Sequence, residues 1–120
     1  MAYDEGLADR VRNVLKRRRG ISERNMFGGL SFLVNGNMSC GVVGDVLMVR
    51  VGPERYQEAL GNKHARVMDF TGTPLRGYVY VERGGHRTAP GLKKWVGLGV
   101  DFARSLPKKA PKKKRVSRSR

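Results

Sequence analysis

The spacing of apolar residues predicts three helices. Within residues 4–18, acidic residues occupy the first turns, basic residues follow the last apolar position, and one helical stripe holds Leu7, Val11, Val14 and Leu15. A short helix is expected from Gly52-Pro53 to Gly61, because proline is favoured at the first helical position. The clearest period lies in residues 88–106, where the stripe comprises Leu92, Trp95, Val96, Gly99, Phe102, Ala103 and Leu106.

From Arg24 to Val51 the period changes to two, which is typical of strands. Asn35-Gly36 and Gly44-Asp45 predict two tight turns, because these residues tolerate positive φ. The strand at 46–51 is apolar on both faces, so we expect it to be central in its sheet. On the strand before it, one face is expected to carry Met38, Cys40 and Val42.

Two more strands are expected at residues 66–70 and 75–82. Tight turns between consecutive strands imply antiparallel pairing, and helices with one apolar stripe need a sheet face to cover. The predicted fold is therefore α+β, with two layers and the order α-β(3-4)-α-β(2)-α. Tyr78 and Tyr80 share a strand face, which we expect a helix to cover rather than nucleic-acid bases.

Charge separates the chain into two predicted parts. The net charge of the 120 residues is +15, and the stretch 107–120, PKKAPKKKRVSRSR, contributes +8 of it. This stretch has too few apolar side chains to offset the entropy of ordering, so we expect a folded domain at 1–107 and a disordered basic tail at 108–120. One cysteine allows no intrachain disulfide, and neither a signal peptide nor a membrane span is recognisable, which favours a cytoplasmic protein.

Two basic segments are candidate binding sites for nucleic acid, the commonest polyanion that a soluble protein meets. One is the cluster Lys16, Arg17, Arg18 and Arg19 after the first helix, where four cations exceed what the helix dipole needs. The other is the tail, with Lys108, Lys109, Lys112, Lys113, Lys114, Arg115, Arg118 and Arg120. Composition alone equally allows a tail that only aids solubility.

An ordered set of motifs resembles the N-terminal domain of the TfoX/Sxy competence regulators over residues 1–108. In the first half they are Arg24-Asn25-Met26-Phe27-Gly28-Gly29, Phe32, Asn35-Gly36 and Leu47-Met48-Val49-Arg50-Val51. In the second half they are Met68-Asp69-Phe70-Thr71-Gly72, Pro74, Arg76-Gly77-Tyr78-Val79-Tyr80-Val81, Leu92, Trp95-Val96 and Ser105-Leu106-Pro107.

The resemblance implies a bacterial, cytoplasmic α+β domain similar to the secretion-chaperone architecture, in the manner of the stand-alone, single-domain members. In the regulators it implies a role in switching on DNA-uptake genes. The regulators carry a second, helical domain after this one, where the present sequence has its basic tail. The resemblance supplies no catalytic residue.

Other groupings of reactive residues favour structural roles. Gly28-Gly29 precedes a strand rather than a helix, which indicates a bend and not a phosphate loop. Cys40 alternates with apolar residues and is predicted to be buried and inert, while His64 and His86 lie in polar stretches that read as exposed loops. Their spacing is not that of a zinc site, and the carboxylates form no acid–base pair. We therefore predict no cofactor, metal or small-molecule ligand.

Three functions stay open at this point. The first is a non-enzymatic regulatory or accessory protein of the TfoX N-terminal type, with weak, non-specific nucleic-acid binding through the tail. The second is a protein-interaction module, such as a homodimer, whose tail is solubilising. The third, which we rank last, is a small enzyme with its site near Cys40 or Gly28-Gly29.

Overall fold

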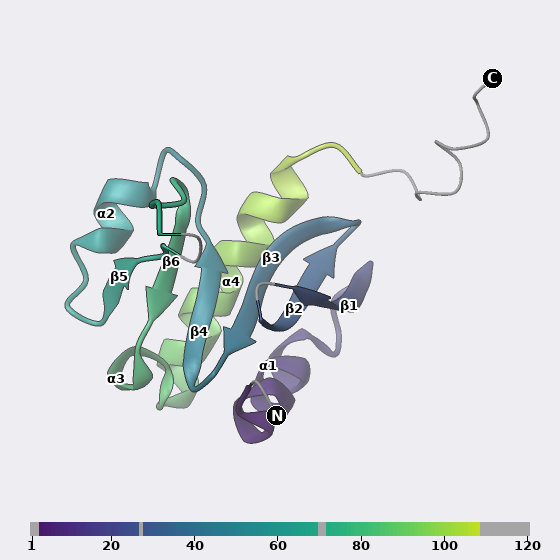
Figure 1. Ribbon diagram of the computed structural model, residues 1–120. Coiled ribbons are helices and arrows are strands. Elements are labelled where there is room, and N and C mark those ends of the chain that lie inside the picture. The colour runs from purple at the N-terminus through teal and green to yellow at the C-terminus, as the bar shows by residue number, and fades with distance from the viewer. Residues whose placement is uncertain (1–2, 27, 70–71, 109–120) are drawn as a thin grey trace.

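A computed structural model describes residues 3–26, 28–69 and 72–108. Figure 1 shows the elements in chain order: α1 (Glu5–Leu15), β1 (Ile21–Met26), β2 (Gly29–Val34), β3 (Asn37–Val43), β4 (Val46–Arg50), α2 (Tyr56–Leu60), β5 (Ala65–Val67), β6 (Tyr78–Val81), α3 (Arg83–His86) and α4 (Ala89–Ser105). Within these residues, no helix has the length and apolar character needed to span a membrane.

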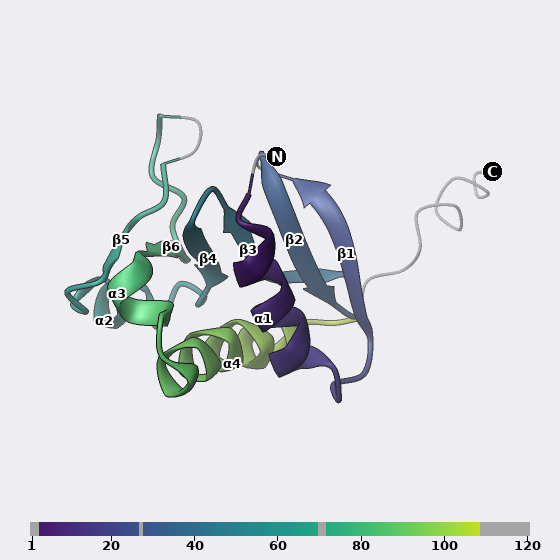
Figure 2. The ribbon, with the colours of Figure 1, turned by 90° about the horizontal axis from the view of Figure 1, so that it is seen from below.

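The strands form one open antiparallel sheet in the order β1-β2-β3-β4-β6-β5. Figure 2, seen from below, shows α1 and α4 packed on one side of this sheet. The predicted two-layer α+β fold is confirmed. The central position expected for the doubly apolar strand is also confirmed, because β4 lies between β3 and β6.

The main core lies between the sheet and the helices. It joins the stripes of α1 and α4 to the sheet face that carries Phe32, Cys40, Leu47, Val49 and Val79, all fully buried. The capping side chains hold both helices at their predicted starts: Asp4 accepts from the amide of Leu7, and Thr88 accepts from the amide of Gly91. At its C-terminal end α4 passes beyond the core, so Phe102 and Leu106 are only half-buried.

Gly99 lets α4 approach the sheet closely. A Cβ atom added at Gly99 would collide with the backbone carbonyl of Ser39 in β3. Gly97, two residues earlier on the same helix, has open space at the same position. Gly99 lies on the predicted apolar stripe of this helix, and its lack of a side chain permits the close packing.

A bulge in β3 changes which residues share a face. Phe32 pairs with Cys40 but Leu33 pairs with Met38, so Ser39 is the extra residue, and its Oγ donates to the Phe32 carbonyl at 2.9 Å. The prediction that Met38 shares a face with Cys40 and Val42 is wrong, because the extra residue reverses the alternation. Met38 instead packs in a second cluster with Met48, Met68 and Tyr80.

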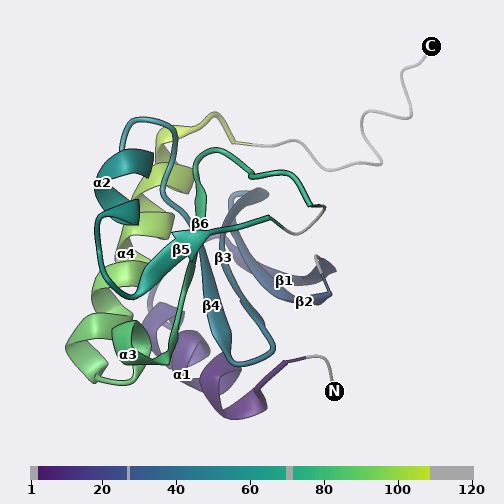
Figure 3. The same cartoon turned by 60° about the vertical axis from the view of Figure 1, so that its left-hand side comes forward.

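This second cluster lies on the face opposite the main core, where it is closed by the β5–β6 connection. That connection extends away from the helices in Figure 3, and its Met68 and Leu75 pack against Tyr78 and Tyr80. The prediction that a helix covers the two tyrosines is therefore wrong. Arginines stack on the rings instead, with Arg66 4.8 Å from the centroid of Tyr80.

Both predicted tight turns are confirmed. Asn35 and Gly36 have φ of 54° and 83°, and Gly44 has a φ of 57° between β3 and β4. The strand β1, by contrast, was not recognised as a separate element. It lies at the edge of the sheet with mostly exposed side chains, so its sequence shows no alternation of buried and exposed positions.

Several predicted boundaries need correction. The first helix ends at Leu15 rather than at 18, because the buried stripe stops there and Gly20, with a φ of 75°, turns the chain. The short helix begins at Tyr56 and not at Pro53, because the amides of Val51 and Gly52 bond to the carbonyl of Gly77.

Strands β5 and β6 are shorter than expected. Helix α3 was not predicted, since two of its four residues are glycine.

The two glycines of α4 give a matched test of this packing. Gly97→Ala should raise the free energy of unfolding by up to about 1 kcal/mol, because alanine favours the helix and meets no neighbour. Gly99→Ala should lower it by about 1–3 kcal/mol, because the methyl group forces α4 away from β3. Chemical denaturation of the two variants measures both values. Equal stabilisation by the two substitutions would contradict the close approach at Gly99.

Candidate nucleic-acid interface

The cluster Lys16–Arg19 lies just past the end of α1. Lys16 is the C-cap residue, and all four side chains are exposed. The chain is held in a turn here, because the amide of Arg18 donates to the carbonyl of Leu15 at 2.8 Å. Lys16 can complement the helix dipole, but Arg17, Arg18 and Arg19 lie beyond the helix and point to another role.

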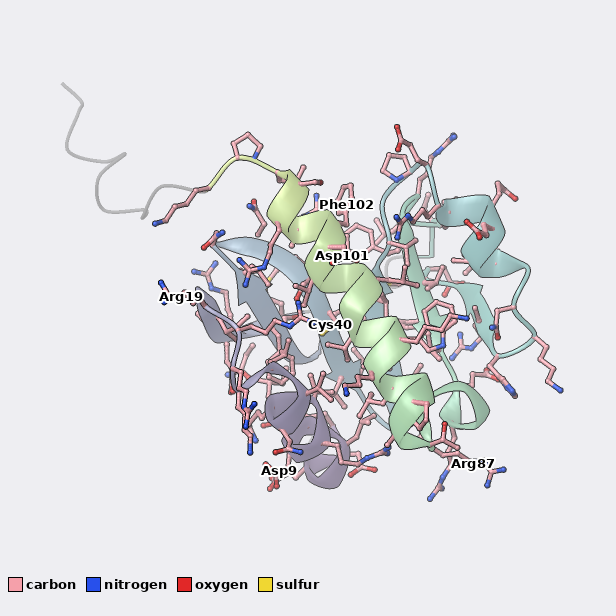
Figure 4. The ribbon with its side chains drawn as sticks, turned by 180° about the vertical axis from the view of Figure 1, so that it is seen from behind. Asp9, Arg19, Cys40, Arg87, Asp101 and Phe102 are labelled. Carbon is pink, nitrogen blue, oxygen red and sulfur yellow. The ribbon has the colours of Figure 1, made fainter. Side chains whose placement is uncertain are left out.

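The C-terminal end of α4 lies at the same end of the molecule. Arg104 donates from Nη2 to the carbonyl of Arg19 at 3.0 Å, which joins the last turn of α4 to the cluster. Asn37 donates from Nδ2 to the carbonyl of Pro107 at 3.0 Å, which fixes the point where the tail leaves the domain. Figure 4 shows Arg19 on the side of the molecule from which the chain continues beyond α4.

These contacts place the cluster at the same end of the domain as Pro107 and Lys108, where the predicted tail begins. We call the surface formed by Lys16–Arg19, Arg104 and Lys108 the basic end. Its side chains are all exposed. The tail therefore begins beside the cluster predicted from the first helix, although the two are about ninety residues apart in sequence.

Two carboxylates close to the end of α1, those of Asp9 and Glu23, are engaged by Arg12. Arg12 binds Glu23 through Nε at 2.8 Å and Asp9 through Nη1 at 2.7 Å, and these hydrogen bonds raise the pKa of its guanidinium. Among the described residues, the remaining ion pair joins Arg66 to Glu82. None of the ion pairs among the described residues includes a residue of the basic end. Lys16 and Arg18 also line a shallow groove of about 410 Å³ between α1 and β1.

Most of the predicted tail residues lie outside the described part of the chain. Lys108 is described and exposed. The others are Lys109, Lys112, Lys113, Lys114, Arg115, Arg118 and Arg120. Sequence reasoning missed Arg104, which binds the Arg19 carbonyl. Its place in the last turn before the tail is the one signal that could have identified it.

The residues considered for catalysis are not brought together. Cys40 is fully buried, and its sulfur contacts the hydroxyl of Ser39 at 3.9 Å. No hydrogen bond in the described region joins Cys40 to His64 or His86. The prediction that both histidines are exposed loop residues is wrong: His64 is half-buried, and His86 is 4% exposed at the end of α3, with Nε2 3.1 Å from the carbonyl of Asp45.

Gly28-Gly29 forms the bend that the sequence indicates. Gly28 has a φ of 76°, and a Cβ at Gly29 would collide with the carbonyl of Val42 in β3. This geometry serves close strand packing rather than a phosphate cradle. In the described stretches, no three His, Cys, Asp or Glu side chains lie close enough to hold a metal ion.

Comparison with known families places most of the chain in a described family. Residues 13–103 match the family described as the TfoX N-terminal domain, which covers β1 to β6 and nearly all of α4. The search of curated proteins gives no match.

The burial of Cys40 predicts a specific pH dependence. Burial raises the pKa of the thiol from 9.0 to about 12, so the thiol stays protonated in the folded protein at a pH where the unfolded chain ionises. Its contribution to stability is complete below pH 9 and is lost as the pH rises toward 12. Between pH 8 and pH 10, the free energy of unfolding of the unsubstituted protein should therefore fall by about 1 kcal/mol more than that of the Cys40→Ala variant.

Chemical denaturation of the two proteins across this range measures the difference. Lysine and tyrosine titrate in both proteins, so their effects cancel in the comparison. Thiol labelling gives an independent check, because the native protein at pH 8 should react with a thiol reagent only as fast as it unfolds. Rapid labelling, or equal losses of stability in the two proteins, would show that Cys40 is accessible.

Proposed function

The chain belongs to the TfoX N-terminal domain family, and from this premise we propose that it is a non-catalytic regulatory or accessory protein whose basic end binds nucleic acid through the phosphate backbone. The family supports the regulatory or accessory role. The nucleic-acid partner rests on one observation: the bonds from Arg104 to Arg19 and from Asn37 to Pro107, which place the cluster and the start of the tail side by side.

Two adjacent basic segments bind a polyanion more strongly than either would alone. Once the tail holds a nucleic acid, the cluster Lys16–Arg19 meets phosphates at a high effective concentration, so the second contact costs little additional entropy. Each cation that neutralises a phosphate releases counterions. The described cations of the basic end are exposed, which suits contacts with phosphates rather than with base edges, so the binding we propose is independent of sequence.

A protein-interaction module is the second candidate, and one observation favours it. Half-buried Leu98 of α4 lines a groove of about 490 Å³ beside α2, and half-buried Phe102 lines another of about 490 Å³ between α4 and residues 51–55. Dimerisation through the exposed edge strand β1 is less favourable. A symmetric antiparallel pairing centred on this strand places Glu23 opposite Glu23, or Arg24 opposite Arg24, of the second copy.

A salt titration by fluorescence anisotropy on duplex DNA tests the nucleic-acid proposal. With about five cations on phosphates at once, the slope of log K against log salt should be near −4 to −5 for the intact chain, with micromolar or weaker affinity at physiological salt. Deleting residues 108–120 should make the slope of log K against log salt less steep. In this shortened chain, replacing Lys16–Arg19 by Gln should abolish the DNA binding that remains.

The control replaces four exposed cations away from the basic end, namely Arg55, Lys63, Lys93 and Lys94, by Gln. This variant changes the net charge equally and should keep most of the binding. No detectable binding by the intact chain at low salt would end the nucleic-acid proposal and favour the protein-interaction module.

Asn37 allows a second test that alters no charge. Asn37→Ala removes the hydrogen bond that fixes Pro107, so the start of the tail is no longer held beside the cluster. We expect affinity for duplex DNA to fall about 2- to 10-fold with an unchanged salt slope, since ordering must now occur on binding. Asn13→Ala, on the exposed face of α1, is the matched control. Unchanged affinity of Asn37→Ala would mean that the two basic segments act independently.

A further inference from the structure

A ridge of side chains runs along α4 on the face opposite its buried stripe. We call its four residues, Lys94, Gly97, Leu98 and Asp101, the α4 ridge. Lys94 and Asp101 are exposed, and Gly97 and Leu98 between them are half-buried. In Figure 4, seen from behind, α4 crosses the front of the molecule between α1 and α2, and Asp101 is labelled on it. The α4 ridge therefore lies on the outer surface of the domain.

The glycine at the centre of the ridge has no packing role inside the domain. Glycine lowers the stability of a helix interior relative to alanine. At Gly99 this cost accompanies the close contact with the carbonyl of Ser39, but a Cβ atom at Gly97 would meet no atom of the described residues within 4 Å. A glycine on the surface of a helix lets another backbone approach closely. Gly97 is therefore suited to a helix that packs on α4 from outside.

The ridge also carries one charge of each sign, placed at equal distances from its centre. Lys94 is as far from Gly97 and Leu98 on one side as Asp101 is on the other. Neither Lys94 nor Asp101 belongs to an ion pair within the described residues. Arg104, one turn beyond Asp101, donates to the carbonyl of Arg19 instead.

This order of residues is complementary to itself. If two copies of α4 pack antiparallel about a twofold axis between Gly97 and Leu98, residues at equal distances from the axis face each other. Lys94 of each copy then faces Asp101 of the other. Both residues lie about 5 Å along the helix from the axis, so they stay close over the usual range of helix crossing angles. A parallel pair would instead place like charges opposite each other.

We propose that the chain forms a homodimer by antiparallel packing of α4 on α4 of a second copy. Gly97 and Leu98 lie at the twofold axis, and two ion pairs between Lys94 and Asp101 flank it. The charges select a second copy over a uniformly acidic or basic partner, which would meet a like charge at one of the two positions. One pair of helices makes a small interface, so the dissociation constant is on the order of 100 μM.

The high positive charge of the chain is compatible with this dimer. Arg104 lies about 10 Å along α4 from the axis, so the two basic ends are about 20 Å apart, on opposite sides of the interface. This separation exceeds the Debye length of about 8 Å at physiological salt. The dimer does not depend on nucleic-acid binding, because the α4 ridge shares no residue with the basic end. Failure of the DNA titration would therefore leave the proposal standing.

Sedimentation equilibrium of the full chain, from about 10 μM to about 1 mM at physiological ionic strength, measures the dimer. Lys94→Glu and Asp101→Lys, each alone, place like charges opposite each other at both contacts and should weaken the dimer at least about tenfold. The variant with both substitutions restores opposite charges at the original net charge. Its dissociation constant should return to within about threefold of that of the unsubstituted chain.

Lys93→Glu is the matched control for Lys94→Glu, because it makes the same change in net charge at the neighbouring exposed position, outside the α4 ridge. This control should dimerise at least as well as the unsubstituted chain, since it lowers the repulsion between copies. Gly97→Ala should weaken the dimer about 2- to 10-fold, although it stabilises the dilute monomer.

Three results would overturn the proposal. One is a chain that remains monomeric at about 1 mM. Another is a single charge reversal, at Lys94 or at Asp101, that leaves the dimer unchanged. The third is a double variant that fails to restore the dimer.

Discussion

The contact between the backbone of α4 and the carbonyl of Ser39 sets the geometry of the whole domain. Ser39 is the bulged residue of β3, its carbonyl faces α4, and only a residue without a side chain at position 99 lets α4 lie against it. The position of α4 on the sheet in turn fixes the position of its last turn. There Arg104 donates to the carbonyl of Arg19, and the carbonyl of Pro107 accepts from Asn37. The basic end therefore depends on a packing contact in the core.

The sequence predicts those parts of the fold whose burial or turn geometry leaves a local pattern of residues. The stripe of α4, the turns at Asn35-Gly36 and Gly44-Asp45, and the double burial of β4 all follow from local patterns. The edge strand β1 and the short helix α3 leave no such pattern, because few of their side chains are buried. The bulge at Ser39 is invisible for a different reason: one extra residue reverses the alternation without changing composition.

The candidate sites divide in the same way. Charge density along the chain identifies Lys16–Arg19 and the tail as separate segments, but their proximity depends on contacts between residues 70 and 85 positions apart. The contact from Arg10 to the carbonyl of Arg87 could not be found from the sequence, because the two residues become neighbours only when α1 and the end of α3 meet.

The order of elements has a consequence for how the chain is made. A ribosome releases β1 to β6 before α4, so the apolar face of the sheet forms before the helix that covers most of it has been synthesised. Until then α1 is the main cover for Phe32, Val42 and their neighbours. The nascent sheet is therefore exposed to misassociation for the time needed to add about twenty residues. During that interval the exposed apolar strands are a target for chaperones that bind unfolded chains.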